Sequence, residues 1–141
     1  MTTSTVSLPY SAPSKSARII GWTMSGFVIV FLLFDAVIKF IMPPVVVQTT
    51  VNELGFQAHH IGIIGLTGLL GVVLYAIPRT AILGAVLLMA QFGGAMTANL
   101  RIDAPLFSHI LFPVYLGILM WGGLWLRMPT LRSLFPIISK E

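Results

Sequence analysis

An aspartate and a lysine lie inside the otherwise apolar run "FLLFDAVIKFI" at residues 31–41. Asp35 and Lys39 are four residues apart, so on a helix they share one face and can form an ion pair. A lysine can extend its ammonium to the lipid headgroups, whereas a short aspartate needs a partner or a wet crevice. Charges within membrane helices usually face the bundle interior and mark a functional site. The alternative is a pair that only stabilises the end of a helix.

Other polar side chains are predicted at the same depth as this pair. His60 opens the second apolar segment, Asn99 ends the third, and His109 opens the fourth. Gln91 lies deeper in the third segment and shares a helical face with Asn99, which predicts a polar stripe along a cavity. The histidines can also be ordinary interfacial residues. The candidate ligand-binding residues are Asp35, Lys39, His60, Gln91, Asn99 and His109.

Sequence patterns that would specify a reaction are missing. The chain has no cysteine, which excludes disulfides, thiol nucleophiles and iron-sulfur clusters. No H-E-x-x-H or other metal-ligand spacing is present, and "FSHIL" around His109 lacks the glycines of a nucleophile elbow. We therefore assign no catalytic residue and no metal ligand. A general acid or base role for Asp35 or a histidine is kept as an alternative.

The composition indicates that lipid is the solvent of this chain. Of 141 residues, 57% are apolar and 9% are charged, whereas a soluble domain carries roughly 25% charged residues. The net charge is +4, but the basic residues are scattered between apolar runs. A nucleic-acid-binding protein would concentrate them on one face. The expected partner is a bilayer, and we expect no nucleic acid.

Four apolar segments have the length needed to cross a bilayer, which is about 20 residues for a helix. They cover residues 19–42, 60–77, 80–100 and 108–126. The sequence therefore predicts an all-α protein with a four-transmembrane-helix bundle at residues 19–126. Residues 1–18 are expected to form a disordered cytoplasmic tail, and residues 127–141 a cytoplasmic tail at the membrane interface.

Basic residues gather on the side of the predicted membrane that holds both chain ends. By the positive-inside rule, this side is cytoplasmic. The residues are Lys15, Arg18, Arg79, Arg127, Arg132 and Lys140.

The connection at residues 43–59 is predicted to contain a short amphipathic helix on the opposite surface. Two prolines can start it, and Gly55 can end it. Val47, Val51 and Leu54 would share its apolar face.

Small residues in the second and third segments favour close helix packing. This packing can occur inside one bundle or against a second copy. The residues are Gly62, Gly65, Gly68 and Gly71, followed by Ala90, Gly94 and Ala98. Trp121 and Trp125 are expected to anchor the fourth helix at the interface.

The order of these features resembles the DoxX-like family of small four-helix membrane proteins. The resemblance rests on "LLFDAVIKF", "ELGF", "GIIGLTGLLGVVLYAIPRT", "FGGAMTANL" and "FSHILFPVYLGILMWGGLWLR", and extends over residues 21–136. It implies a multi-pass protein of the bacterial inner membrane. The family name comes from a subunit associated with thiosulfate:quinone oxidoreductase, and relatives are linked to redox homeostasis and membrane-protein assembly. Lys39 and His109 match family positions, whereas Asp35 departs from the family pattern.

Three functions are compatible with the sequence. The first is a non-catalytic accessory protein that binds a lipophilic small molecule, such as a quinone or a lipid, in a cavity of the outer half. The second is an oxidoreductase subunit or an acid/base isomerase. The third is a scaffold or assembly factor that packs its glycine faces against another membrane protein or a second copy.

Overall fold

The structure is a computed structural model that describes residues 11–138, and these residues are predominantly helical. Four helices within this part of the chain are long and apolar enough to cross a membrane. Three of them are α1 (Lys15–Ile41), α3 (Ala58–Ala76) and α4 (Ala81–Arg101). The fourth, Leu106–Arg127, consists of the π-helical turn η2 (Leu106–Ile110) and α5 (Phe112–Arg127). The predicted fold class is confirmed.

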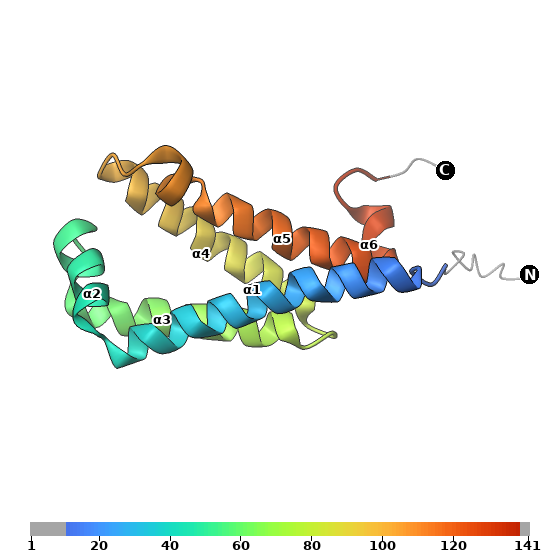
Figure 1. Cartoon of the computed structure of the whole chain (residues 1–141), viewed down its shortest axis with the longest axis horizontal. Coiled ribbons are helices and arrows are strands. Elements are labelled where there is room, and N and C mark those ends of the chain that lie inside the picture. Colours follow the sequence, from blue (N-terminus) through green and yellow to red (C-terminus); the bar gives the residue numbers. More distant parts are fainter. Residues whose placement is uncertain (1–10, 139–141) are drawn as a thin grey trace, which may run out of the picture.

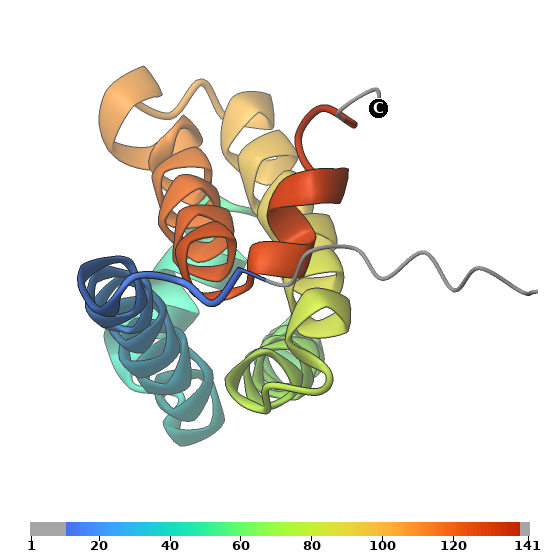
Figure 2. The same cartoon turned by 90° about the vertical axis from the view of Figure 1, so that its right-hand side faces the viewer.

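The four long helices form a ring (Figure 2). Helix α1 contacts α3 and α5, α3 contacts α4, and α4 contacts α5. The start of α1, the α3–α4 turn, the end of α5 and the short helix α6 (Pro129–Leu134) lie at one end of the bundle, here called the proximal end (Figure 1). Helix α2 (Pro44–Val47), its π-helical continuation η1 (Gln48–Glu53) and η2 lie at the opposite, distal end.

Three glycines of α3 bring neighbouring helices into close contact. A Cβ atom on Gly65 would lie 3.1 Å from the Cβ of Lys39 in α1, and one on Gly71 would lie 2.8 Å from a Leu88 methyl carbon in α4. A Cβ on Gly68 would meet the side chain of Gln91 at 2.8 Å. These glycines therefore pack inside the bundle, as the first of the two alternatives predicted.

Other small residues have no such neighbour. A Cβ atom on Gly62 of α3, or on Gly93 or Gly94 of α4, would meet nothing within 4 Å. The small residues of the third segment thus leave part of α4 uncovered within the single chain.

Helix α1 starts earlier than the sequence predicted. It begins at Lys15, because the Ser14 hydroxyl accepts a hydrogen bond from the Ala17 amide at 3.2 Å and caps the helix. Residues 15–18 are therefore helical and not part of a disordered tail. The rest of that prediction falls mainly on residues 1–10, which lie outside the described residues.

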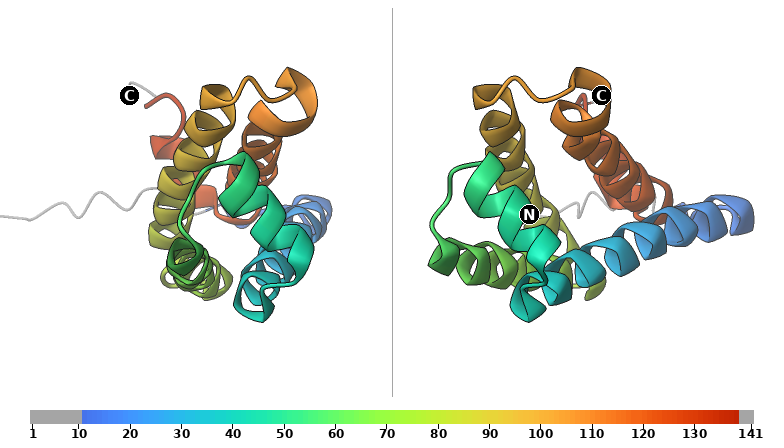
Figure 3. Two further views of the ribbon diagram at one scale, coloured as in Figure 1. Left: turned by 90° about the vertical axis from the view of Figure 1, so that its left-hand side faces the viewer. Right: turned by 60° about the vertical axis from the view of Figure 1, so that its left-hand side comes forward.

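The predicted surface helix is present as α2 and η1 and lies across the distal end (Figure 3). Val47, Val51 and Leu54 are half-buried, as their shared apolar face predicted. Gly55 ends the helix with φ +74°, a left-handed conformation that suits glycine. The Arg101 guanidinium at the end of α4 donates a hydrogen bond to the Leu54 carbonyl and ties this helix to the bundle.

The predicted C-terminal tail is largely helical within the described residues. Arg127 is the last residue of α5 and is only 8% exposed, so it belongs to the bundle. Helix α6 follows at once and packs against α5, with Leu131 buried in the core. Residues 139–141 lie outside the described part of the chain.

Candidate functional site

Asp35 and Lys39 form an ion pair on α1. The Lys39 side chain is 17% exposed and the Asp35 side chain 38% exposed. Lys39 lies in the seam between α1 and α3, where its Cβ packs beside Gly65. Asp35 therefore has a partner on its own helix, and a surface pair of this kind is worth about 1 kcal/mol or less.

Gln91 connects α4 to α3. Its Oε1 accepts a hydrogen bond from the Thr67 hydroxyl at 3.2 Å, and its Nε2 donates to the Ile64 carbonyl at 3.4 Å. The absence of a side chain on Gly68 provides the space for this amide. Gln91 thus acts as a polar link between two helices.

The remaining three predicted residues bond within their own segments. His60 accepts a hydrogen bond from the Gln57 amide at 3.3 Å through Nδ1, which caps α3. Asn99 donates to the Ala95 carbonyl of α4 at 2.9 Å. His109 is exposed, and its Nδ1 lies 2.8 Å from the Ser108 hydroxyl.

The six predicted residues therefore do not converge through any hydrogen bond or ion pair in the described structure. Asp35 and Lys39 pair with each other, and the other four have separate partners. Among residues 11–138, no three His, Cys, Asp or Glu side chains gather closely enough to hold a metal ion. A ligand role for the six residues stays a prediction.

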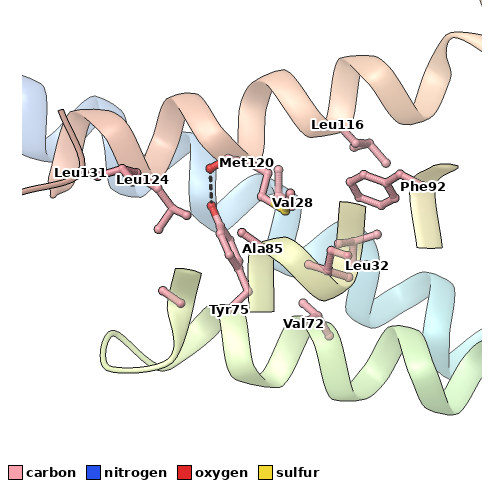
Figure 4. Close-up of a cluster of buried hydrophobic side chains, with 12 residues drawn as sticks. Val28, Leu32, Val72, Tyr75, Ala85, Phe92, Leu116, Met120, Leu124 and Leu131 are labelled. Carbon is pink, nitrogen blue, oxygen red and sulfur yellow. Dashed lines mark hydrogen bonds between the residues drawn. The ribbon is translucent and has the colours of Figure 1, made fainter. Parts of the chain in front are cut away.

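A polar centre at the proximal half was missed by the sequence reasoning. Tyr75 of α3 is fully buried, and its hydroxyl donates to the Met120 carbonyl of α5 at 2.8 Å (Figure 4). The Ser25 hydroxyl of α1 lies 2.9 Å from the Tyr75 oxygen. Because the Tyr75 hydroxyl donates its only proton to the Met120 carbonyl, the Ser25 hydroxyl must donate to the Tyr75 oxygen. One phenol thereby joins three helices.

Glycines allow the backbones around this centre to approach each other. A Cβ on Gly84 of α4 would overlap the backbone of Tyr75. A Cβ on Gly123 of α5 would lie 2.5 Å from the Ser25 hydroxyl, and one on Gly21 of α1 would lie 2.9 Å from the Gly123 carbonyl. Small residues at helix contacts permit such close packing in lipid.

Arg127 is the charged member of the proximal half. Its guanidinium carbon lies 4.0 Å from the centre of the Trp22 ring and 5.6 Å from that of Tyr75. These rings stabilise the charge through cation–π attraction. The Nε and Nη2 atoms are nevertheless buried without a hydrogen-bond partner. Leaving buried charged donors unpaired costs about 1–3 kcal/mol or more.

The sequence held a weak signal for this centre. Gly21 and Ser25 are small residues four apart on α1, a spacing that marks close helix contact. Tyr75 looked like one more apolar residue, and Arg127 like an ordinary orientation charge. Only the three-dimensional structure shows that the three polar side chains are buried and lie close to one another.

An apolar groove of about 650 Å³ runs along α5 beside α4, from Val114 in the first turn of α5 to Leu126 at its proximal end. Met89 of α4 forms one wall, and Val114, Gly117, Ile118 and Trp121 of α5 form the other. Ile118 is 63% exposed, so the groove opens on the side that would face lipid.

The chain after α6 closes the proximal end of this groove. The Phe135 ring stacks on Trp121, with 4.8 Å between ring centres, and its carbonyl accepts from the Trp125 indole N–H at 3.2 Å. The Arg132 guanidinium donates to the carbonyls of Trp125 and Leu126 at 2.8 Å each and thereby caps α5. The two tryptophans predicted as interface anchors thus also line a groove.

Four spanning helices with exposed apolar faces define this chain as a multi-pass membrane protein with a four-helix bundle. The chain belongs to the DoxX-like family, whose model matches residues 23–123, from α1 to near the end of α5. Among curated proteins and solved structures, none matches the chain.

Proposed function

We propose that this protein is a non-catalytic accessory protein of the bacterial inner membrane that binds a lipophilic molecule, a quinone or a lipid. The observation that carries the proposal is the apolar groove between α4 and α5. The proposed binding position is therefore this groove rather than the six residues inferred from sequence.

The size and chemistry of the groove support binding of a hydrocarbon tail. Its volume of about 650 Å³ falls within the roughly 300–1,000 Å³ of ligand sites. Its walls offer side chains of Met89, Val114, Ile118 and Trp121 and almost no polar atoms. A molecule dissolved in the bilayer can enter sideways, because the groove opens along the lipid-facing surface of α4 and α5.

The stacked rings of Trp121 and Phe135 form an end wall of the groove against which a bound molecule would stop. The stacked rings lie at the proximal end of the groove and limit how far a tail can extend. Trp121 also supplies a flat surface on which a ring can stack. The groove lacks a charged or acid/base group, which favours a binding role over catalysis.

Native mass spectrometry of the protein released from its own membrane tests this proposal. The change Ile118→Trp fills the groove, whereas Leu66→Trp places the same ring on an equally exposed position of α3, since the two residues are 63% and 60% exposed. We expect a bound lipophile in the wild type and in Leu66→Trp, and its loss in Ile118→Trp. Equal retention in the two variants would contradict binding in the groove.

The same measurement separates the groove from the distal residues. The double change Asp35→Asn with Lys39→Met removes the distal ion pair and leaves the groove intact. We expect it to retain the lipophile. Loss in this variant together with retention in Ile118→Trp would move the ligand site to the distal end.

The proposed orientation places the proximal end in the cytoplasm. The described basic residues of that end outnumber those of the distal end, which are Lys39 and Arg101. Because the chain has no cysteine, single cysteines at Ser14 and Asn52 give a clean test. In intact cells, a membrane-impermeant thiol reagent should label position 52 and not position 14. The reverse labelling pattern would show that the protein has the opposite orientation in the membrane.

A scaffold or assembly role is the second candidate. It is favoured by the uncovered small residues of α4, where Gly93 and Gly94 meet nothing within 4 Å and Ala90 and Thr97 are exposed. Such a surface suits a second membrane helix. Cross-linked complexes in cells should disappear in Gly94→Leu and persist in Leu66→Trp. Complexes that survive Gly94→Leu would exclude this surface.

A further inference from the structure

The buried guanidinium of Arg127 needs a hydrogen-bond acceptor, and the described residues supply none to its Nε and Nη2 atoms. Its side chain is more than nine-tenths buried, and Nε and Nη2 have no hydrogen-bond partner. The aromatic rings of Trp22 and Tyr75 lie over the guanidinium. Such stacking stabilises the positive charge but accepts no hydrogen bond from N–H groups in the guanidinium plane.

No carboxylate of the described residues is available to Arg127. The three that lie within residues 11–138 are Asp35, Glu53 and Asp103, and all belong to the distal half. Asp35 is thirteen residues beyond Trp22 on the same helix, a separation of roughly 20 Å. None of the carboxylates within residues 11–138 can therefore form an ion pair with Arg127.

A second groove adjoins the buried arginine at the proximal end of α1. It has a volume of about 370 Å³ and is lined by Arg18, Ile19, Trp22 and Thr23. Trp22 is 42% exposed, forms a wall of this groove and packs under the Arg127 guanidinium. The groove thus presents an exposed arginine, while a buried arginine lies behind the same indole.

We propose that Arg127 and Arg18 bind the phosphate of an anionic phospholipid from the leaflet at the proximal end. Arg127 ends the fourth apolar span, the level at which lipid phosphates lie. A phosphate offers several acceptor oxygens to the planar fork of an arginine. Lys15 and Arg132 add positive charge at this end, which attracts anionic lipids. The groove itself is lined by α1, and the Trp22 ring separates it from Arg127, so one phosphate reaches both arginines when this ring turns aside. The site is independent of the lipophile groove.

Lipid retention in native mass spectrometry tests the site. The full chain is transferred from phosphatidylglycerol vesicles into detergent, and the fraction that keeps one lipid is measured. We expect Arg127→Gln to reduce retention about tenfold and the exposed Arg18→Gln to reduce it about threefold. Arg79→Gln is the matched control, because Arg79 is exposed at the same end, and it should equal the wild type.

Three results would overturn the proposal. The first is equal lipid retention in Arg79→Gln and Arg18→Gln, because Arg18 would then not contact the lipid. This comparison tests the site even if Arg127→Gln does not fold. The second is displacement of the lipid by inorganic phosphate at millimolar concentration, which would make a free anion the ligand. The third is a rise in retention in Glu141→Gln, which would identify the Glu141 side-chain carboxylate as an acceptor that competes with the lipid.

Phosphatidylcholine vesicles provide the comparison between lipids. We expect the wild type to keep phosphatidylglycerol at least about tenfold more than phosphatidylcholine, because choline carries a positive charge beside the phosphate. Equal retention of the two lipids would contradict recognition of an anionic lipid. The Ile118→Trp variant should keep phosphatidylglycerol like the wild type, which separates this site from the groove between α4 and α5.

Discussion

The two ends of the bundle use polar residues in different ways. At the distal end the titratable side chains are numerous, and most of their contacts stay within one segment, as in the Asp35–Lys39 pair and the His60 cap. Among the described residues Arg101 is the exception, since it donates to the Leu54 carbonyl. At the proximal half, Ser25, Tyr75 and Arg127 are buried and lie between helices. The number of polar residues is therefore a poorer guide to importance than their burial and the number of helices they join.

This contrast predicts that the largest stability loss comes from crowding the proximal half. Gly84→Ala places a methyl group on the backbone of Tyr75, where neither helix can yield without moving. We expect the free energy of unfolding, measured by SDS titration in mild detergent micelles, to fall by about 3 kcal/mol or more.

Gly94→Ala is the matched control for this change, because it lies on the same helix and its Cβ would meet nothing within 4 Å. We expect it to leave stability unchanged or to raise it by up to about 1 kcal/mol through better helix propensity. Similar losses in the two variants would show that α4 is not tightly packed against α3.

The second largest effect is expected at the Tyr75 hydroxyl. Tyr75→Phe removes the bond to the Met120 carbonyl and leaves the Ser25 hydroxyl without its partner. We expect a loss of about 1 kcal/mol by the same titration. Tyr115→Phe, at a residue that is 41% exposed, should cost almost nothing.

A double-mutant cycle sharpens this prediction. If Ser25 donates to Tyr75, the losses in Ser25→Ala and Tyr75→Phe should sum to more than the loss in the double variant. Additive losses would mean that the two hydroxyls do not interact, and the proximal polar centre would reduce to separate contacts.

The fold could be predicted from the sequence because hydrophobic length and turn residues act locally. The spans, the surface helix with Val47 and Val51 on its inner face, and the stop at Gly55 all follow from neighbours in sequence. The start of α1 was misplaced by four residues, since apolar content marks the hydrocarbon and not the Ser14 cap that begins the helix.

The candidate sites could not be predicted in the same way because they depend on which faces meet. Ser25 and Tyr75 are fifty residues apart in sequence, and nothing local indicates that they share a hydrogen bond. The groove between α4 and α5 needs Met89 and Phe135 to lie around one helix face. Asp35, Lys39 and His60 drew attention to the distal end, where their partners are near in sequence.

A smaller loss is expected when a polar link between two helices is removed at mid-bundle. Gln91→Leu deletes the hydrogen bonds to Thr67 and to the Ile64 carbonyl. We expect a loss of about 0.6 kcal/mol, typical of a hydrogen bond between membrane helices. Asn99→Leu on the same helix removes only a bond to its own backbone and should cost less. A larger loss for Asn99→Leu would mean that the Asn99 side-chain amide also bonds to a residue of another helix.

The smallest effect is expected for the ion pair that first drew attention in the sequence. Asp35 is more than one third exposed, so solvent and salt screen its attraction to Lys39. Asp35→Asn should lower the free energy of unfolding by less than about 0.5 kcal/mol. Raising the salt concentration from 0.1 to 1 M should reduce even that difference. A loss as large as that of Tyr75→Phe would break the contrast between the two ends, because it would require Asp35 to be held by a second, buried partner.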